Sequence, residues 1–290
     1  MSRARWVILT PSETEPEWYR RVTDAVAAAG RTPVPWTADL APEVLNDSKA
    51  VVLADNAATA LAAGVTPAAV VFTDPESSVA AIGKRHSPGF PQAFWLSSLM
   101  LAEASALPPE CRVVSGPLAV GGDPVELLPG LVVRAPPLPP RPRGPRHAAM
   151  ALRLYVDGRP PVGQSASVSP TLFLYDARGQ VSRTPGVVET TGRVRTLLYG
   201  PYMGLPPGVW KTSVSFSVDE DAADRPYRFD WGDGDGFEEM EFMPGQAGVF
   251  EVELTREWTQ PSAAQVRVVL MRAAFAGVFR LLDARITRVG

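Results

Sequence analysis

The sequence has almost no cysteine or histidine. Cys111 is the single cysteine, and His86 and His147 are the only histidines. An internal disulfide is therefore excluded, and a zinc site built from His and Cys ligands is nearly so. Cys111 lies beside an expected strand, where a cysteine is more often a small buried hydrophobe than a nucleophile. Any enzyme chemistry in this chain would have to rest on carboxylates, and the sequence favours a non-catalytic protein over an enzyme.

Strong charge and long apolar runs are also missing. The formal net charge is −3, so the sequence has no electrostatic footprint of a nucleic-acid-binding protein. The apolar stretches fall short of the roughly 20 residues needed to span a bilayer, and residues 6–9 are too short for the apolar core of a signal peptide. We expect synthesis in the cytoplasm without a signal peptide, with the protein staying there or on a particle released by lysis.

A length of 290 residues predicts two domains. In residues 1–122, short apolar runs alternate with helical patterns, which predicts a small α/β domain with a parallel sheet, Rossmann-like or flavodoxin-like. The expected strands are residues 6–10, 34–36, 50–54, 68–72 and 112–115. The expected helices are residues 16–29, 57–63, 75–84 and 92–107.

Proline marks the boundary between the domains. The chain has 30 prolines, and six of them fall in APPLPPRPRGPR, residues 135–146. Such a segment favours an extended polyproline spacer. We therefore predict a Pro-rich linker over residues 123–148. A PxxP ligand is the alternative reading of the same segment.

Residues 149–290 show a period of two and almost no helical pattern, which predicts a β-sandwich or jelly roll of about eight strands. Expected strands include residues 150–156, 171–175, 194–199 and 278–289. The clearest stretch is residues 200–218, interpreted as a Gly/Pro-rich corner at 200–208 followed by a long strand. Five alternate residues of that strand are expected to face the core: Trp210, Thr212, Val214, Phe216 and Val218.

The run LYGPYMGLPPGVW at residues 198–210 and the closing FRLLDARITRV at residues 279–289 carry a resemblance. This C-terminal half resembles the carbohydrate-binding-module-like β-jelly-roll domains of bacterial polysaccharide-related proteins. The resemblance covers roughly residues 150–290, and it implies sugar binding through exposed aromatic side chains. The N-terminal half resembles no family.

A sugar site needs flat aromatic faces together with a few polar groups. Aromatic residues near turns, or on the outward register of a strand, are the candidates. They are Tyr199, Tyr202, Trp231, Phe237 and Trp258. The alternative for each is ordinary core packing.

The segment DWGDGDGFEEME, residues 230–241, concentrates acidic residues. Asp233, Asp235 and Glu238 could ligate a structural calcium, which takes several oxygen ligands from a flexible loop. The favoured alternative is a solvated hairpin turn, because Asp-Gly is a standard hairpin signal. No other cofactor is expected.

Polar residues follow the strands of the α/β domain, where ligands of parallel sheets usually bind. They are Thr10, Ser12, Asp55, Asn56, Thr73 and Asp74. Asp and Asn in these positions favour helix caps. The alternative is an active site at Asp55 and Asp74.

Three functional hypotheses follow. The first is a non-catalytic glycan-binding protein that recognises a bacterial surface polysaccharide, as an adhesion component such as a spike or fibre of a phage-like particle. Its α/β domain would contact a protein assembly partner, and the chain could form a homo-oligomer. The second is a cytoplasmic enzyme of polysaccharide synthesis or modification. The third is a purely structural assembly protein whose sandwich is an interaction surface.

Overall fold

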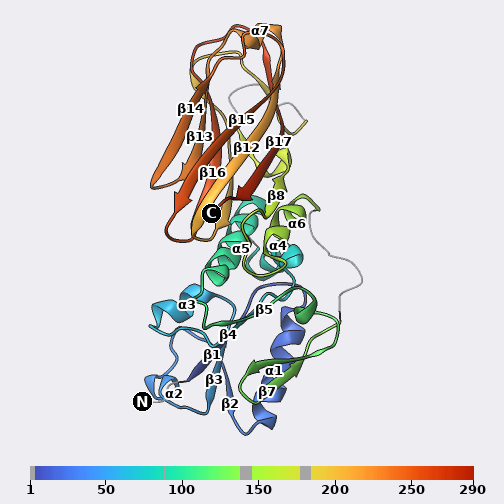
Figure 1. The fold of residues 1–290 in the computed structure, drawn as a ribbon, viewed down its shortest axis with the longest axis vertical. Coiled ribbons are helices and arrows are strands. Elements are labelled where there is room, and N and C mark those ends of the chain that lie inside the picture. Colours follow the sequence, from blue (N-terminus) through green and yellow to red (C-terminus); the bar gives the residue numbers. More distant parts are fainter. Residues whose placement is uncertain (1–3, 88, 138–145, 177–183) are drawn as a thin grey trace. The chain divides into compact units, whose positions relative to one another are not determined.

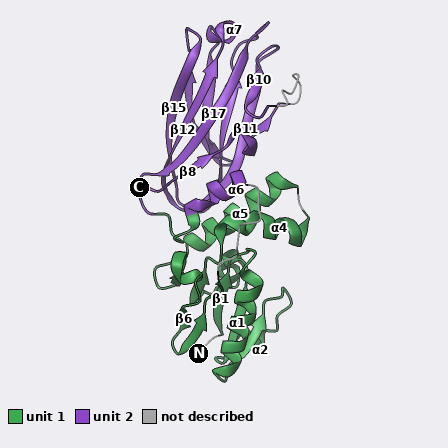
Figure 2. Cartoon of the chain, turned by 90° about the vertical axis from the view of Figure 1, so that its right-hand side faces the viewer, with its two compact units in different colours: residues 1–145, 155–160 green, residues 146–154, 161–290 purple. Residues whose placement is uncertain are grey.

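A computed structural model of the chain describes residues 4–87, 89–137, 146–176 and 184–290. The chain divides into two compact units, residues 1–145 with 155–160 and residues 146–154 with 161–290 (Figure 2). Each unit has its own sheets and its own core. Among the described helices, none is both long and apolar enough to cross a membrane.

The first unit is an α/β fold around a parallel sheet of order β2-β3-β1-β4-β5 (Figure 1). The strands are β1 (Arg5–Leu9), β2 (Thr32–Pro35), β3 (Ala50–Ala54), β4 (Ala69–Val71) and β5 (Arg112–Val114). The α-helices are α1 (Glu15–Ala28), α2 (Pro42–Leu45), α3 (Ala57–Ala62), α4 (Ser78–His86) and α5 (Phe90–Ser105), with 3-10 turns η1 (Pro75–Ser77) and η2 (Gly116–Ala119). The central strands β3 and β4 are buried along their whole length, as expected for strands covered on both faces.

The hairpin β6 (Pro124–Leu128) and β7 (Leu131–Arg134) also belongs to the first unit. Its apolar side chains join the buried cluster around Trp18 and Val22 of α1. We expected these residues to belong to the linker. Their alternating apolar side chains instead pack against helix α1. Of the Pro-rich segment, residues 138–145 lie outside the described residues.

The second unit is a β-sandwich of two five-stranded sheets in which all strand pairs are antiparallel. One sheet has the order β10-β17-β12-β15, with β8 also paired to β17; we call it the serine sheet. The other has the order β14-β13-β16-β11-β9, and we call it the aromatic sheet. The serine sheet consists of β8 (Ser165–Val168), β10 (Val187–Glu189), β12 (Gly208–Val218), β15 (Gly248–Trp258) and β17 (Val278–Arg288). The aromatic sheet consists of β9 (Leu174–Tyr175), β11 (Arg195–Leu205), β13 (Tyr227–Asp233), β14 (Gly236–Phe242) and β16 (Ser262–Leu270).

Strand β12 confirms the alternation expected from the sequence. All five predicted inward residues are buried, and the residues between them are half-buried. Phe216 lies at the centre of the core, with ring centroids 4.9 Å from Phe229 and 5.1 Å from Phe279. Strands β14 and β15 each end a sheet, and their exposed residues include Glu238, Glu239, Glu241, Glu251, Glu253 and Glu257.

The corner expected at residues 200–208 is wrong in its extent. Gly200–Leu205 continues strand β11, and the chain crosses to the other sheet at Pro206 and Pro207. Pairing persists through the glycines because β11 absorbs an irregularity between Pro201 and Met203. Tyr202 in that irregularity has a φ of 59°, a left-handed conformation that is uncommon for a large side chain.

The strands expected at 150–156 and 171–175 are corrected as well. Residues 146–152 form helix α6 (Arg146–Leu152), followed by η3 (Arg153–Tyr155). Short apolar runs fit either period, and here Ala148, Ala149 and Leu152 are buried at helical spacing. Only Leu174–Tyr175 of the second segment is a strand, after η4 (Pro170–Leu172). One further short helix, α7 (Glu220–Ala223), follows β12.

Candidate functional site

The outer face of the aromatic sheet carries a row of functional side chains. Arg267 of β16 lies opposite Asp230 of β13 and opposite Tyr199 of β11, and Asp230 lies opposite Glu239 of β14. Residues that face each other across paired strands share one side of the sheet. The inward residues between them, such as Val266 and Val268, are buried in the core, so this row is on the solvent side.

Asp230 anchors the row. Its side chain is fully buried, although it belongs to the outer register, because two arginines cover it. Arg228 Nε lies 2.8 Å from Asp230 Oδ1. Arg267 donates from Nε at 3.0 Å, and its Nη2 lies 2.9 Å from the same carboxylate. A charge-assisted pair of this kind fixes the guanidinium in position, so Arg267 is held in place without a ligand.

Phe237 supplies the first aromatic ring. The guanidinium carbon of Arg267 lies 3.5 Å from the centre of that ring, a cation–π contact. Phe237 is opposite Gly232. A Cβ on Gly232 would collide with the backbone carbonyl oxygen of Gly236 and would lie 2.8 Å from both Cα and Cδ1 of Phe237. Glycine at position 232 therefore lets the β14 backbone and the Phe237 ring lie close to β13.

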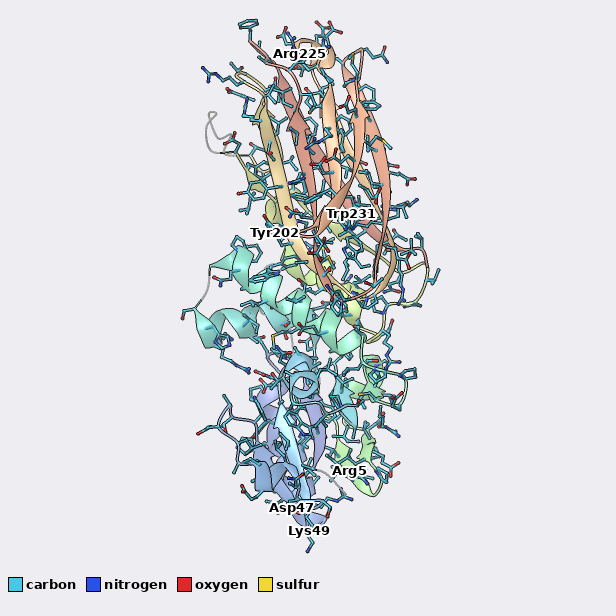
Figure 3. All side chains as sticks on the ribbon, turned by 90° about the vertical axis from the view of Figure 1, so that its left-hand side faces the viewer. Arg5, Asp47, Lys49, Tyr202, Arg225 and Trp231 are labelled. Carbon is cyan, nitrogen blue, oxygen red and sulfur yellow. The ribbon has the colours of Figure 1, made fainter. Side chains whose placement is uncertain are left out.

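Tyr199 and Tyr202 supply two more rings. Their ring centroids are 6.2 Å apart at an angle of 80°, an edge-to-face arrangement. Partial burial, followed by the neighbouring Tyr199, raises the pKa of Tyr202, while Arg267 acts in the opposite sense. The phenol of Tyr202 (labelled in Figure 3) is therefore neutral at physiological pH and can both donate and accept hydrogen bonds.

We call this set the aromatic face: Tyr199, Tyr202, Phe237, Asp230 and Arg267. The three rings are half-buried, so each presents part of its surface to solvent. The guanidinium and the phenol hydroxyls provide hydrogen-bonding groups beside those surfaces. This combination suits a ligand that has apolar C–H patches and many hydroxyl groups.

Trp231 and Trp258 do not belong to a surface site, contrary to the expectation that they bind a ligand. Trp231 is fully buried and Trp258 is 4% exposed. Their rings meet edge to face at 5.2 Å inside the sandwich. Trp231 lies on the inward register of β13, and Trp258 donates from Nε1 to Asp233 Oδ2 at 2.6 Å, so both indoles are part of the core.

The acidic residues proposed for calcium are not brought together. Asp233 is buried and accepts hydrogen bonds from Trp258 and from the backbone N–H of Asp235 at 3.0 Å. Asp235 and Glu238 are exposed. Within the described part of the chain, no group of three or more His, Cys, Asp or Glu is placed to hold a metal ion. The segment forms the β13–β14 hairpin, as the Asp-Gly alternative expected.

The strand ends of the first unit form a hydroxyl cluster. Ser12 Oγ lies 2.5 Å from Thr73 Oγ1, which donates to the carbonyl of Thr10 at 2.7 Å. Asn56 accepts from the N–H of Ala58 at 2.7 Å, which is the helix cap that the sequence favoured at this position. The bonds from Thr73 to Ser12 and to Thr10 join the carboxyl ends of β1 and β4.

Asp55 and Asp74 have different surroundings at that sheet edge. Asp55 is paired with Arg85 at 2.5 Å, and Arg85 also pairs with Glu15. Burial is the main cause that raises the pKa of Asp74. Among the described residues, the side chains of Asp55 and Asp74 share no hydrogen-bond or ion-pair partner. The alternative of an enzyme site at this pair stays a prediction. Cys111 is buried, and burial raises its pKa to about 11, which leaves it an unreactive thiol at neutral pH.

No protein-family model and no curated protein sequence matches the chain. Solved structures do match part of it. One is the CBM36-1 domain of a multidomain xylanase from the hindgut metagenome of Trinervitermes trinervoides, with 12% identity over 44% of this chain and 99% of that chain and a TM-score of 0.30. Another is the CBM22-1 xylan-binding domain of Paenibacillus barcinonensis Xyn10C, with 15% identity over 44% and 96% and a TM-score of 0.26.

The C-terminal half resembles carbohydrate-binding modules. A third match of this kind is TmCBM61 in complex with β-1,4-galactotriose, at 12% identity over 43% of this chain and 81% of that one, with a TM-score of 0.29. Strand pairing shows a parallel-sheet α/β unit and an antiparallel β-sandwich, which is the fold class that the sequence predicted.

Sequence reasoning missed the polar half of the aromatic face. Asp230 of β13 and Arg267 of β16 are 37 residues apart in the sequence, and their pairing depends on which strands are neighbours in the sheet. Alternation within each strand puts each residue on the outward side, but it does not indicate that the two meet.

Proposed function

We propose that the second unit binds a carbohydrate on the aromatic face. The observation that carries the proposal is the arrangement of three half-exposed rings, Tyr199, Tyr202 and Phe237, around a guanidinium that Asp230 and Phe237 already hold. Sugars offer C–H faces that pack on aromatic rings and hydroxyl groups that accept from a planar cation. A prepositioned Arg267 loses little conformational freedom on binding, which favours affinity.

A comparison of the outer faces of the two sheets supports the choice of this face as the binding site. The outer residues of β12 are lysine and serines whose polar groups already bond to glutamates of β15. The aromatic face instead leaves rings partly open to water. Clustered exposed rings beside polar groups are typical of binding surfaces.

The test is a glycan array probed with the full chain, followed by titration calorimetry with the best polysaccharide. Tyr199→Ala and Arg267→Ala are each expected to weaken binding at least tenfold. Phe275→Ala is the matched control, because Phe275 is a 92% exposed aromatic of the same unit outside the aromatic face. The Phe275→Ala variant is expected to bind the polysaccharide with the affinity of the wild type.

Two results would contradict the proposal. One is the absence of binding to every glycan on the array by a folded chain. The other is binding that Tyr199→Ala, Arg267→Ala and Phe275→Ala weaken equally, because the sugar would then be held elsewhere. Tyr202→Phe removes the hydroxyl and keeps the ring, so it separates their contributions to sugar affinity. Phenylalanine also has nearly the same backbone preferences as tyrosine, which matters at this left-handed position.

We extend the proposal to the source of the glycan and the setting of the chain. The glycan would be a bacterial surface polysaccharide, and the chain a spike or fibre component of a phage-like particle that is assembled in the cytoplasm and released by lysis. In that setting the first unit would contact an assembly partner. The support is physical: single sugar sites bind weakly, and display in many copies multiplies their strength.

The array distinguishes these finer statements. Capsular and lipopolysaccharide glycans should bind at least tenfold more tightly than xylan or β-1,4-galactan. Sedimentation of lysate from producing cells should place the chain in a particle fraction visible by electron microscopy. Preference for the plant glycans, or recovery only in the unassembled fraction, would contradict the extension and leave sugar binding itself intact.

A further inference from the structure

A cavity of about 590 Å³ opens at the carboxyl end of the parallel sheet in the first unit. All its lining residues belong to that unit. Phe72, Thr73 and Asp74 line it directly after β4, and the segment after β5 supplies a second side. The lining is completed by Pro75, Glu76, Gly116, Pro117, Val120, Gly121, Asp123 and Val156.

The cavity lies at the carboxyl ends of β4 and β5, two neighbouring strands at one side of the parallel sheet. Open α/β sheets bind their ligands outside the carboxyl ends of the strands. A volume of several hundred Å³ is the usual size of a small-molecule site, so the place and the size agree.

The lining combines apolar surface with negative charge. Phe72, Val120 and Val156 provide the apolar wall, and Asp74, Glu76 and Asp123 provide carboxylates. None of the lining residues is a lysine, arginine or histidine. The nearby bases Lys84 and Arg85 are held by Glu13, Glu15 and Asp55, which do not line the cavity.

The carboxylates are not arranged for a metal ion. Across the residues that the structure describes, no cluster of three or more acidic, His or Cys side chains could hold one. The cavity is also far larger than an ion. Burial is the main cause that raises the pKa of Asp74; a hydrogen bond with Ser77 acts in the opposite sense, and the negative charges of Glu76 and Glu13 raise the pKa further.

We propose that this cavity binds a small organic cation, a primary amine on an apolar body. The ammonium group lies between Asp74 and Asp123, and the apolar body packs on Phe72 and Val120. The carboxylates of the lining attract a cation, and burial of the body against the wall adds hydrophobic free energy. The proposal is independent of sugar binding by the second unit.

The test uses 2-phenylethylamine as the probe, with 2-phenylethanol and 3-phenylpropanoate as neutral and anionic analogues of similar shape. Titration calorimetry on the full chain should show the amine binding at least tenfold more tightly than either analogue. Asp74→Asn should weaken the amine at least tenfold and leave the alcohol unchanged. Asp39→Asn is the matched control, since Asp39 is an exposed aspartate of the same unit outside the cavity, and it should bind like the wild type.

Val120→Phe tests the place of binding without changing any charge. It narrows the cavity from its wall and should weaken amine binding at least tenfold in a chain that keeps its wild-type circular dichroism and melting temperature. The proposal is overturned if no amine binding is found, if the propanoate binds as tightly as the amine, or if Asp74→Asn and Val120→Phe both bind like the wild type.

Discussion

The two outer faces of the sandwich have the same alternation but opposite chemistry. On the serine sheet, Lys211 and Ser213 both bond to Glu253, at 2.7 and 2.8 Å, and Ser215 bonds to Glu251 at 3.1 Å. These polar groups satisfy one another. On the aromatic sheet, Asp230 forms ion pairs with two arginines, but the rings around them still face water.

The difference shows that alternation alone does not identify a binding face. Both faces have outward residues of intermediate burial, so exposure does not separate them. What separates them is the kind of apolar side chain: the aromatic sheet presents a cluster of rings, whereas an exposed apolar residue of the serine sheet, Val249, is aliphatic. Small and charged outward residues are the default for an antiparallel sheet, and a cluster of rings on that side needs a reason.

The largest effect should come from Asp230→Ala. Removing the carboxylate deprives Arg228 and Arg267 of the buried group that they share, and breaking a buried ion pair typically costs about 3–5 kcal/mol. Urea unfolding measures the loss, and Ser215→Ala on the serine sheet is the control, expected to change stability by less than about 0.5 kcal/mol. Equal effects of the two substitutions would remove the distinction between the faces.

Trp258→Phe should lower stability by about 1–3 kcal/mol, because the buried Asp233 loses a donor. Sugar affinity should not change, since Trp258 lies inside the sandwich. Burial tends to raise the pKa of Asp233, but bonds from Ser262, Asp235 and Trp258 hold it lowered overall. Urea unfolding measures the stability of this variant, and titration calorimetry measures its sugar affinity. A loss of affinity without a loss of stability would indicate that Trp258 contacts the sugar.

Tyr199→Ala should show the opposite behaviour. Its ring is half-exposed, so unfolding free energy should change by less than about 0.5 kcal/mol, whereas affinity should fall about tenfold, or ~1.4 kcal/mol. Together with Trp258→Phe this makes a reciprocal pair in one domain. If stability falls more than affinity does, Tyr199 is a packing residue.

The smallest effect belongs to the serine sheet. Lys211 and then Ser213 lower the pKa of Glu253 by hydrogen bonding. A lowered carboxyl pKa stabilises the fold above the pKa of the unfolded chain, and that contribution disappears as pH falls through the folded value. Glu253→Gln should therefore cost less than about 1 kcal/mol at pH 7 and nothing at pH 2, as measured by urea unfolding at both pH values.

The sequence predicted the class of each unit because periodicity is local. The run of β12 and the apolar strands β3 and β4 needed only their own residues. Trp231 was misassigned because its glycine-rich neighbourhood suggests exposure, and Trp258 because it lies close to a turn, while strand register places both indoles inside. Arg267 was missed because its partners come from β13 and β14, and only the order of strands brings them together.

Strands β14 and β15 close their sheets with unpaired backbone edges that bear exposed glutamates. A second copy that approached edge to edge would bring carboxylates against carboxylates, and like charges in that position disfavour strand pairing. The glutamates of these two edge strands therefore oppose the addition of a further strand from a second copy of the chain.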